Sequence, residues 1–188
     1  PVKEKALEYN IPVYQPVKVR DEESVNLIKN INPDVIVVVA FGQILPESIL
    51  AIPKYGCINV HASLLPKYRG AAPIQCSVID GEECSGVSIM YMEKGLDTGD
   101  VISQVVVAIE AKETGGSLHD KLSIEGAKLL ADTLVKLEAG NTTRTKQDDS
   151  LSTYAHMLDK SMGKIDFIKD DAVKIERLIR GLNPWPSA

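Results

Sequence analysis

Apolar positions along the chain fall into two patterns: short unbroken runs, and longer stretches spaced as on one face of a helix. Residues 35–40 form a run of β-branched residues closed by alanine, with no alternation, which is typical of a strand buried on both faces. Other apolar runs predict strands over residues 13–15, 57–61, 86–92 and 101–109. Helical spacing predicts helices over residues 2–9, 21–31, 46–52, 71–80 and 172–180.

The longest predicted helix begins at Ser117 and ends at Gly140. Ser117 and Asp120 have the spacing of a capping box, and the following apolar residues keep one face of the helix apolar. These residues are Leu118, Leu122, Ala127, Leu130, Leu134 and Leu137. Because strands and helices alternate with short connections, the sequence predicts an α/β fold with an open, mostly parallel sheet and helices on both faces.

The composition changes after residues 1–140, which we interpret as the main domain. Residues 141–160 are polar and without periodicity, as in a linker. Residues 161–188 contain one predicted helix and are interpreted as the start of a small carboxyl-terminal domain. The chain opens on Pro1 rather than Met and stops at Ala188 soon after an aromatic turn, so we expect a fragment cut at both ends.

Composition narrows the classes of protein. The 188 residues are 44% hydrophobic and 25% charged, which excludes a disordered or fibrous chain. The longest apolar run, residues 35–41, is far shorter than the roughly 20 residues of a membrane helix, and no signal peptide opens the chain. The three cysteines form no C-x-x-C pair, so we expect a cytoplasmic protein without a membrane partner. The net charge of −5 gives no support to a broad DNA-binding surface but leaves room for a local basic patch.

Polar residues that close an apolar strand mark a candidate site, because ligands of open α/β sheets bind at the carboxyl ends of strands. Asn59 and His61 close one predicted strand and project to the same face, since side chains alternate along a strand. An amide beside an imidazole suits acyl transfer, in which an oxyanion must be held and a proton handled. The pair alone fits equally well a role in satisfying backbone groups at the strand end.

A tight acidic turn, residues 96–100 (Leu-Asp-Thr-Gly-Asp), follows the next predicted strand. Gly99 permits a backbone shape that other residues resist, so Asp97 can be held towards the same sheet edge. By spacing alone, a plain turn between strands is favoured. An aspartic protease is disfavoured, because such enzymes pair two Asp-Thr-Gly turns, and this chain has one copy among helices.

Other templates are absent. The chain has no G-x-G-x-x-G and no G-x-x-x-x-G-K-[ST], so neither a dinucleotide site nor a P-loop is indicated. His61, His119 and His156 lie far apart, without Cys or carboxylate partners at ligand spacing. We therefore expect no metal.

Residues 59–70 (Asn-Val-His-Ala-Ser-Leu-Leu-Pro-Lys-Tyr-Arg-Gly) and the turn at 95–100 together resemble the folate-dependent formyltransferases. The resemblance implies that Asn59, His61 and Asp97 are the catalytic trio. It also implies that the loop after His61 lines the tetrahydrofolate site, and its residues are Ser63, Leu64, Leu65 and Pro66. Lys67 and Arg69 are candidates for phosphate or folate carboxylate contact, or else solvated loop charges.

Three further segments resemble the members of this family that act on methionyl-initiator tRNA: residues 38–42, 70–75 and 180–186. The resemblance implies transfer of a formyl group from 10-formyltetrahydrofolate, a cosubstrate, to the amino group of methionine on that tRNA. Formyltransferases of sugar amines share a related ending, and those of glycinamide ribonucleotide share the trio. A folate-binding fragment without activity is a further alternative.

The resemblance also implies a Rossmann-like sheet in the order 3-2-1-4-5. Residues 13–15 and 35–40 are then strands 3 and 4, and the two strands between them are missing from this chain. A gap of about 14 Å would leave the first of these strands unpaired and expose an edge of the second. We therefore expect these 188 residues alone to be unstable and inactive.

Overall fold

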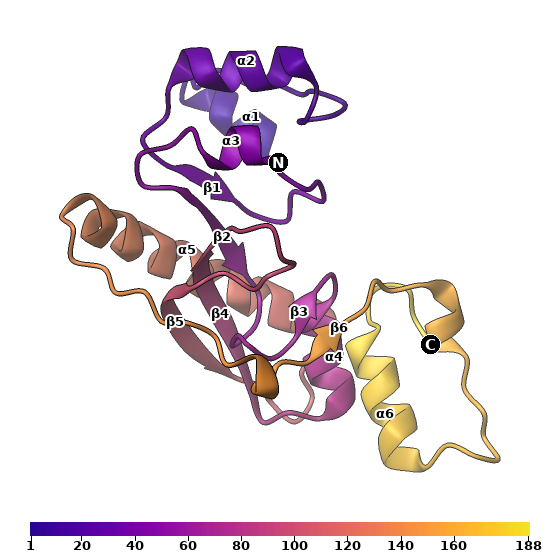
Figure 1. Ribbon diagram of the computed structural model, residues 1–188. Helices are drawn as coiled ribbons and strands as arrows, with labels where there is room; N and C mark the ends of the chain where they lie inside the picture. Colours follow the sequence, from indigo (N-terminus) through magenta and orange to yellow (C-terminus); the bar gives the residue numbers. More distant parts are fainter.

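The computed structural model describes residues 1–188, and Figure 1 shows the arrangement of its elements. The helices are α1 (Val2–Glu8), α2 (Glu22–Ile31), α3 (Glu47–Leu50), α4 (Pro73–Asp80), α5 (Gly115–Glu138) and α6 (Ala172–Gly181), with 3-10 turns at Asp149–Leu151 and Lys160–Gly163. The strands are β1 (Ile36–Val38), β2 (Cys57–His61), β3 (Arg69–Gly70), β4 (Cys84–Tyr91), β5 (Val101–Ala108) and β6 (Tyr154–Ala155). No helix is long and apolar enough to cross a membrane.

The central sheet has the strand order β1-β2-β4-β5, and a two-stranded sheet pairs β3 with β6. The α/β class is confirmed. Within the central sheet β1 and β2 are parallel, whereas β2–β4 and β4–β5 are antiparallel, so the sheet of these residues is more mixed than the mostly parallel one expected. The connection 92–100 is too short for a parallel crossover, which takes about a dozen residues or more.

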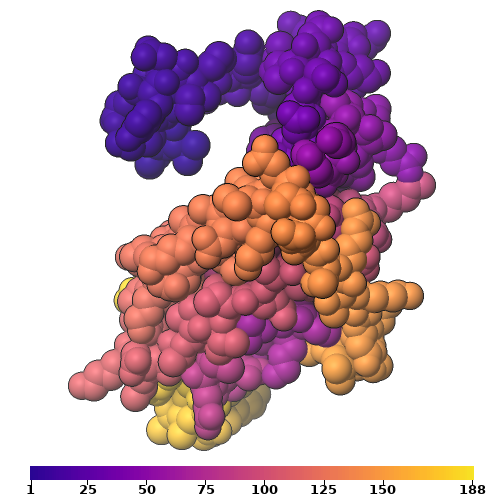
Figure 2. All heavy atoms as spheres, turned by 90° about the vertical axis from the view of Figure 1, so that its left-hand side faces the viewer, coloured from indigo at the N-terminus to yellow at the C-terminus, as the bar shows by residue number.

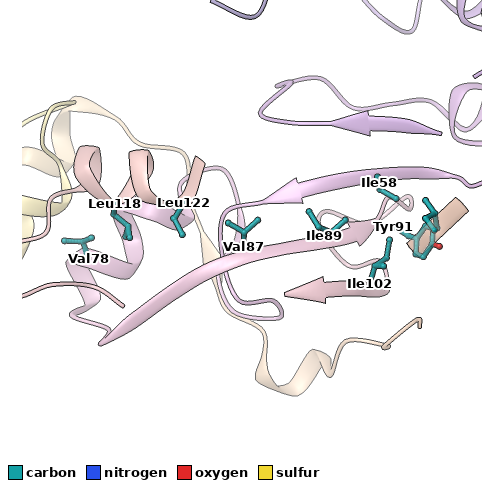
Figure 3. Packing of buried hydrophobic residues seen from close by; sticks show 9 residues of the cluster. Ile58, Val78, Val87, Ile89, Tyr91, Ile102, Leu118 and Leu122 are labelled. Carbon is teal, nitrogen blue, oxygen red and sulfur yellow. The ribbon is translucent and has the colours of Figure 1, made fainter. Parts of the chain in front are cut away.

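Alternation along β2 places apolar side chains on both faces of the sheet. Ile58 joins Val87 and Ile89 of β4 in a core covered by α4 and α5, and Figure 3 shows Leu118 and Leu122 of α5 closing it. On the opposite face Cys57 packs in a second core with residues of the α2 and α3 region, namely Val19, Val25, Leu45 and Ile49. Helices therefore cover both faces, as expected for a buried strand.

The amino-terminal segment has few contacts with this body. Helix α1 has no buried residue, and Figure 2 shows the indigo segment extending away from the rest of the molecule. Residues 13–15 form no strand, which corrects the sequence prediction. A strand needs a hydrogen-bonded neighbour, and the central sheet ends at β1. Strand β1 is itself shorter than expected, because Ala40 adopts a left-handed conformation with φ +45°.

The polar segment 141–160 is ordered along the surface of the main domain. Thr145 forms an isolated bridge with Val101, and β6 pairs with β3. Helix α6 then packs beside α4. Thr145 and β6 thus pair with elements of the main domain. The domain boundaries predicted from the sequence stay a prediction.

Helix α5 begins earlier than expected, because its cap is Thr114. The Thr114 hydroxyl accepts a hydrogen bond from the Ser117 backbone N–H, and the Ser117 hydroxyl accepts a hydrogen bond from the Thr114 backbone N–H. The capping box predicted from Ser117 and Asp120 is therefore shifted by one turn.

We expect Thr114→Ala to lower the free energy of unfolding by about 1 kcal/mol, measured by urea denaturation of a full-length protein. The control Asp120→Ala is expected to change it by no more than about 0.5 kcal/mol.

Candidate active site

Strand β2 carries Asn59 and His61 on the face opposite the α5 core, because Ile58 and Val60 occupy that core. His61 is 5% exposed, and Asn59 is half-buried. The Asn59 side chain makes no hydrogen bond to another residue, although its strand is the central partner of β1 and β4. An amide without a partner at a strand end is free to bond a ligand atom.

The turn after β4 brings Asp97 to His61 across the sheet edge. Asp97 Oδ2 lies 3.7 Å from His61 Nδ1, and it accepts a hydrogen bond of 2.9 Å from the Gly70 backbone N–H. Asp97 adopts a left-handed conformation with φ +52°, which is uncommon outside glycine but tolerated by aspartate. The structure therefore brings His61 and Asp97 together, with Asn59 two residues from His61 on the same face.

The contact made by the second ring nitrogen of His61, Nε2, shows that this nitrogen carries a hydrogen. Nε2 lies 2.9 Å from the Tyr68 carbonyl oxygen, and a carbonyl can only accept, so Nε2 carries a hydrogen. A neutral ring would then turn the lone pair of Nδ1 towards the Asp97 carboxylate. A proton on Nδ1 as well would place a donor on the side of the ring that faces Asp97.

Tyr68, which supplies that carbonyl, is held by its side chain. It has φ +59° and is buried, and its hydroxyl oxygen lies 2.9 Å from Asp80 Oδ2 and 3.0 Å from Glu82 Oε1. Burial, together with these two carboxylates, raises the pKa of the Tyr68 hydroxyl, so it stays a donor. The anchored ring offsets the cost of the left-handed backbone beside His61.

The loop after His61 is bonded into the domain. The Ser88 hydroxyl donates to the Ser63 carbonyl at 2.6 Å and accepts from the Leu65 N–H at 3.0 Å, and Gln104 Nε2 donates to the Leu65 carbonyl at 3.0 Å. Ser63 and Leu65 are buried, and Leu64 lies against Gly86. The backbone groups of Ser63 and Leu65 named here therefore already have partners within the chain.

A cavity of about 260 Å³ borders this loop. Its lining comes from the loop, from β5 and from the segment after α5: Leu65, Pro66, Val101, Ile102, Ser103, Gln104, Thr145, Lys146, Gln147 and Asp148. None of Asn59, His61 and Asp97 lines it. Of the predicted folate-loop residues, only Leu65 and Pro66 face this cavity.

Both basic residues of the loop are paired within the chain. Lys67 Nζ bonds Glu82 at 2.9 Å, and the largest influence on the Glu82 carboxyl is this bond, which lowers its pKa. Arg69 is 9% exposed and bonds Gln147 and Asp149. Arg69 is therefore part of a buried network and is not a solvated loop charge. Gln147 was not identified from the sequence, because it lies in the polar stretch interpreted as a linker.

Apolar side chains are exposed at the same sheet edge. Because β1 and β2 are parallel, the loop after β1 and the end of β2 meet at one edge. Phe41 and Ile44 of that loop are exposed, as is Leu96 beside Asp97. Such a surface suits a flat, partly apolar ligand. No group of three or more His, Cys, Asp or Glu side chains is placed to hold a metal ion.

Comparison with known proteins places the chain in a family. A sequence profile described as formyl transferase matches residues 1–134, and one described as formyl transferase, C-terminal domain, matches residues 157–188. Methionyl-tRNA formyltransferases of Lachnospira eligens and Clostridioides difficile are 63% and 59% identical over all 188 residues. The chain spans 59% and 60% of the length of these two relatives.

Solved structures share the fold. A sugar N-formyltransferase from a Shewanella species superposes with a TM-score of 0.80 at 23% identity, over 98% of this chain and 73% of that one. HypX from Aquifex aeolicus, solved in complex with tetrahydrofolic acid, superposes with a TM-score of 0.74 at 16% identity, over 86% of this chain and 28% of that one. The profile match over most of the chain shows that it belongs to the formyl transferase family.

Proposed function

We propose that this chain is the catalytic part of a methionyl-tRNA formyltransferase, which moves a formyl group from 10-formyltetrahydrofolate to the amino group of methionine on initiator tRNA. The observation that carries the proposal is the identity of 54–63% to enzymes of that name along essentially the whole chain. The similarity includes residues 157–188, which have their own matching domain profile. The proposed partners are therefore folate and methionyl-initiator tRNA, and the proposed compartment is the cytoplasm.

The site offers a route for the chemistry. Bound 10-formyltetrahydrofolate supplies the formyl group. The neutral amine of methionine attacks the formyl carbon, and the formyl oxygen becomes an oxyanion. The Asn59 amide has no partner within the chain and would donate to this oxygen. Nδ1 is the second donor, because Nε2 of His61 is committed to the Tyr68 carbonyl.

Asp97 has two roles in this scheme. Its carboxylate lies 3.7 Å from Nδ1, beyond hydrogen-bond distance, so its charge stabilises the imidazolium while the Nδ1–H is donated to the oxyanion. It then receives the proton that the attacking nitrogen must lose, directly or through a water, and this proton passes to the folate nitrogen as its bond to the formyl carbon breaks. The residues we propose as catalytic are thus Asn59, His61 and Asp97, and Ser63, Leu64, Leu65 and Pro66 are the proposed folate loop.

A direct assay tests the proposal and separates it from its alternatives. A full-length protein with this sequence would be given 10-formyltetrahydrofolate and, in parallel, methionyl-initiator tRNA, a nucleotide-linked amino sugar or glycinamide ribonucleotide. We expect transfer to methionyl-tRNA and at most trace transfer to the two small amines. Transfer to the sugar amine or the glycinamide alone would contradict the proposed acceptor. Binding of folate without turnover on any amine would contradict the proposed activity.

A further inference from the structure

The polar segment 145–155, which we call the strap, lies across both loops of the candidate site. At one end Thr145 and Val101 exchange two backbone hydrogen bonds of 2.9 Å, just after the Asp97 turn. At the other end the Thr153 hydroxyl accepts from the Tyr68 backbone N–H at 2.8 Å. The strap therefore ties the loop that follows His61 to the turn that carries Asp97.

Gln147 is the centre of this strap and is only 7% exposed. Its Nε2 donates to the carbonyl oxygens of Asp97 at 2.8 Å and Gly99 at 2.7 Å. Its Oε1 accepts from Arg69 Nε at 3.0 Å and from Arg69 Nη2 at 2.8 Å. Asp149 in turn accepts from Arg69 Nη2 at 2.8 Å. One amide thus links the turn of Asp97 to the guanidinium next to Gly70.

A primary amide is suited to this position. It presents two N–H donors and an oxygen with two lone pairs, and Gln147 uses all four. The guanidinium charge polarises the amide and strengthens the bonds that it donates. Because the side chain is nearly buried, a donor or acceptor left without a partner here would cost the full penalty of its desolvation.

We propose that Gln147 is a positioning residue for Asp97 and that Arg69 fixes the orientation of Gln147. Asp97 has a left-handed backbone, so its shape depends on outside support. Gln147 holds its carbonyl oxygen, and the N–H of Gly70, which follows Arg69, holds its carboxylate. Together these bonds set the direction in which the carboxylate faces His61. The inference rests on the proposed function of Asp97 in formyl transfer.

The variant Gln147→Glu tests the proposal in a full-length protein. Glutamate keeps the shape and the bonds from Arg69, but it replaces the donating nitrogen with an oxygen that faces two carbonyl oxygens. We expect kcat for methionyl-tRNA formylation to fall about 10- to 100-fold, with KM for both substrates within twofold. The control Asp148→Asn alters an exposed neighbour in the strap and leaves kcat unchanged.

A double-mutant cycle separates positioning from general support of the fold. If Gln147 acts through Asp97, the Gln147→Glu substitution has little further effect on kcat in an Asp97→Asn background. A merely structural role would lower kcat by the same factor in both backgrounds, and that result would overturn the proposal. So would an unchanged kcat for Gln147→Glu in the otherwise natural sequence.

A milder variant covers the case in which Gln147→Glu fails to fold. Arg69→Lys keeps the charge but loses the two-pronged contact with Oε1, so we expect a smaller fall in kcat that also vanishes in the Asp97→Asn background. Equal falls in both backgrounds would again overturn the positioning role. Failure of the proposed function is distinct, since the natural sequence itself would then not formylate methionyl-tRNA.

Discussion

Replacing Asp97 with asparagine in a full-length protein is expected to lower kcat for the proposed formylation of methionyl-tRNA by about 10² to 10⁴-fold, the range for loss of a positioned acid or base. The variant keeps an oxygen that can accept from the Gly70 N–H, so the turn retains its shape. It removes the negative charge 3.7 Å from His61 Nδ1 and the acceptor for the amine proton. Single-turnover kinetics with preformed enzyme and saturating folate measure the chemical step directly.

An exposed His–Asp pair elsewhere in the chain provides a matched control. Asp120 Oδ1 lies 3.1 Å from His119 Nδ1 on α5, with side chains 81% and 65% exposed. Asp120→Asn makes the same chemical change in the same kind of pair, and we expect its kcat to stay within twofold of the natural protein. Equal rates for Asp97→Asn and Asp120→Asn would remove Asp97 from the mechanism.

Asn59→Ala is expected to lower kcat by about 10² to 10³-fold, the cost of one lost oxyanion donor. The Asn59 side chain has no hydrogen-bond partner within the chain, so its removal leaves no orphaned group and changes the free energy of unfolding by about 0.5 kcal/mol or less. The combination of a large loss of rate with unchanged stability and unchanged KM for folate identifies a contact made in the transition state.

The exposed asparagine Asn26 on α2 serves as the comparison for this variant, because Asn26→Ala removes the same amide from a helix surface. Its kcat and urea midpoint should match those of the natural protein. A rise in KM for folate with unchanged kcat in Asn59→Ala would instead show that the amide binds the donor, and the oxyanion role would be wrong.

Much of the fold follows from local pattern. The predicted strand at 57–61 coincides with β2, and the predicted helices at 71–80 and 172–180 match α4 and α6 to within two residues. In each of these elements the spacing of the apolar residues fits one kind of secondary structure, strand or helix, better than the other. The strand predicted at residues 13–15 does not form. A short apolar run becomes a strand only beside a neighbouring strand, and the pattern of the run itself does not show whether that neighbour is present.

Strand direction was also beyond the pattern. A run buried on both faces reads the same in either direction, so the sequence of β4 does not distinguish a parallel from an antiparallel neighbour. The strands predicted at 86–92 and 101–109 already leave a connection too short for a parallel crossover, so the direction of β5 against β4 could have been predicted. The longer connection between β2 and β4 allows either direction, and the structure shows an antiparallel pair. The shifted cap of α5 has a related cause, since Thr114 and Ser117 are both suitable cap residues, and only the hydrogen bond from the Ser117 backbone N–H to the Thr114 hydroxyl decides between them.

The candidate site also has residues that the sequence reveals and residues that it does not. Asn59, His61 and Asp97 are visible in sequence because they close strands or sit in a glycine-containing turn. The groups that support them are not, because Tyr68, Ser88 and Gln147 are ordinary polar residues whose partners lie far along the chain. Gln147 is 50 residues from Asp97, and no local periodicity links the two.

That separation has a consequence for how the protein is made. A nascent chain exposes Asn59, His61 and Asp97 well before residues 145–155 have been added, since synthesis runs from the amino terminus at roughly 5–20 residues per second. Until then the acidic turn lacks its brace, and a polypeptide stopped at the end of α5 contains every proposed catalytic side chain without the means to align them. The carboxyl-terminal limit of the catalytic unit is therefore expected near residue 155, beyond the end of α5.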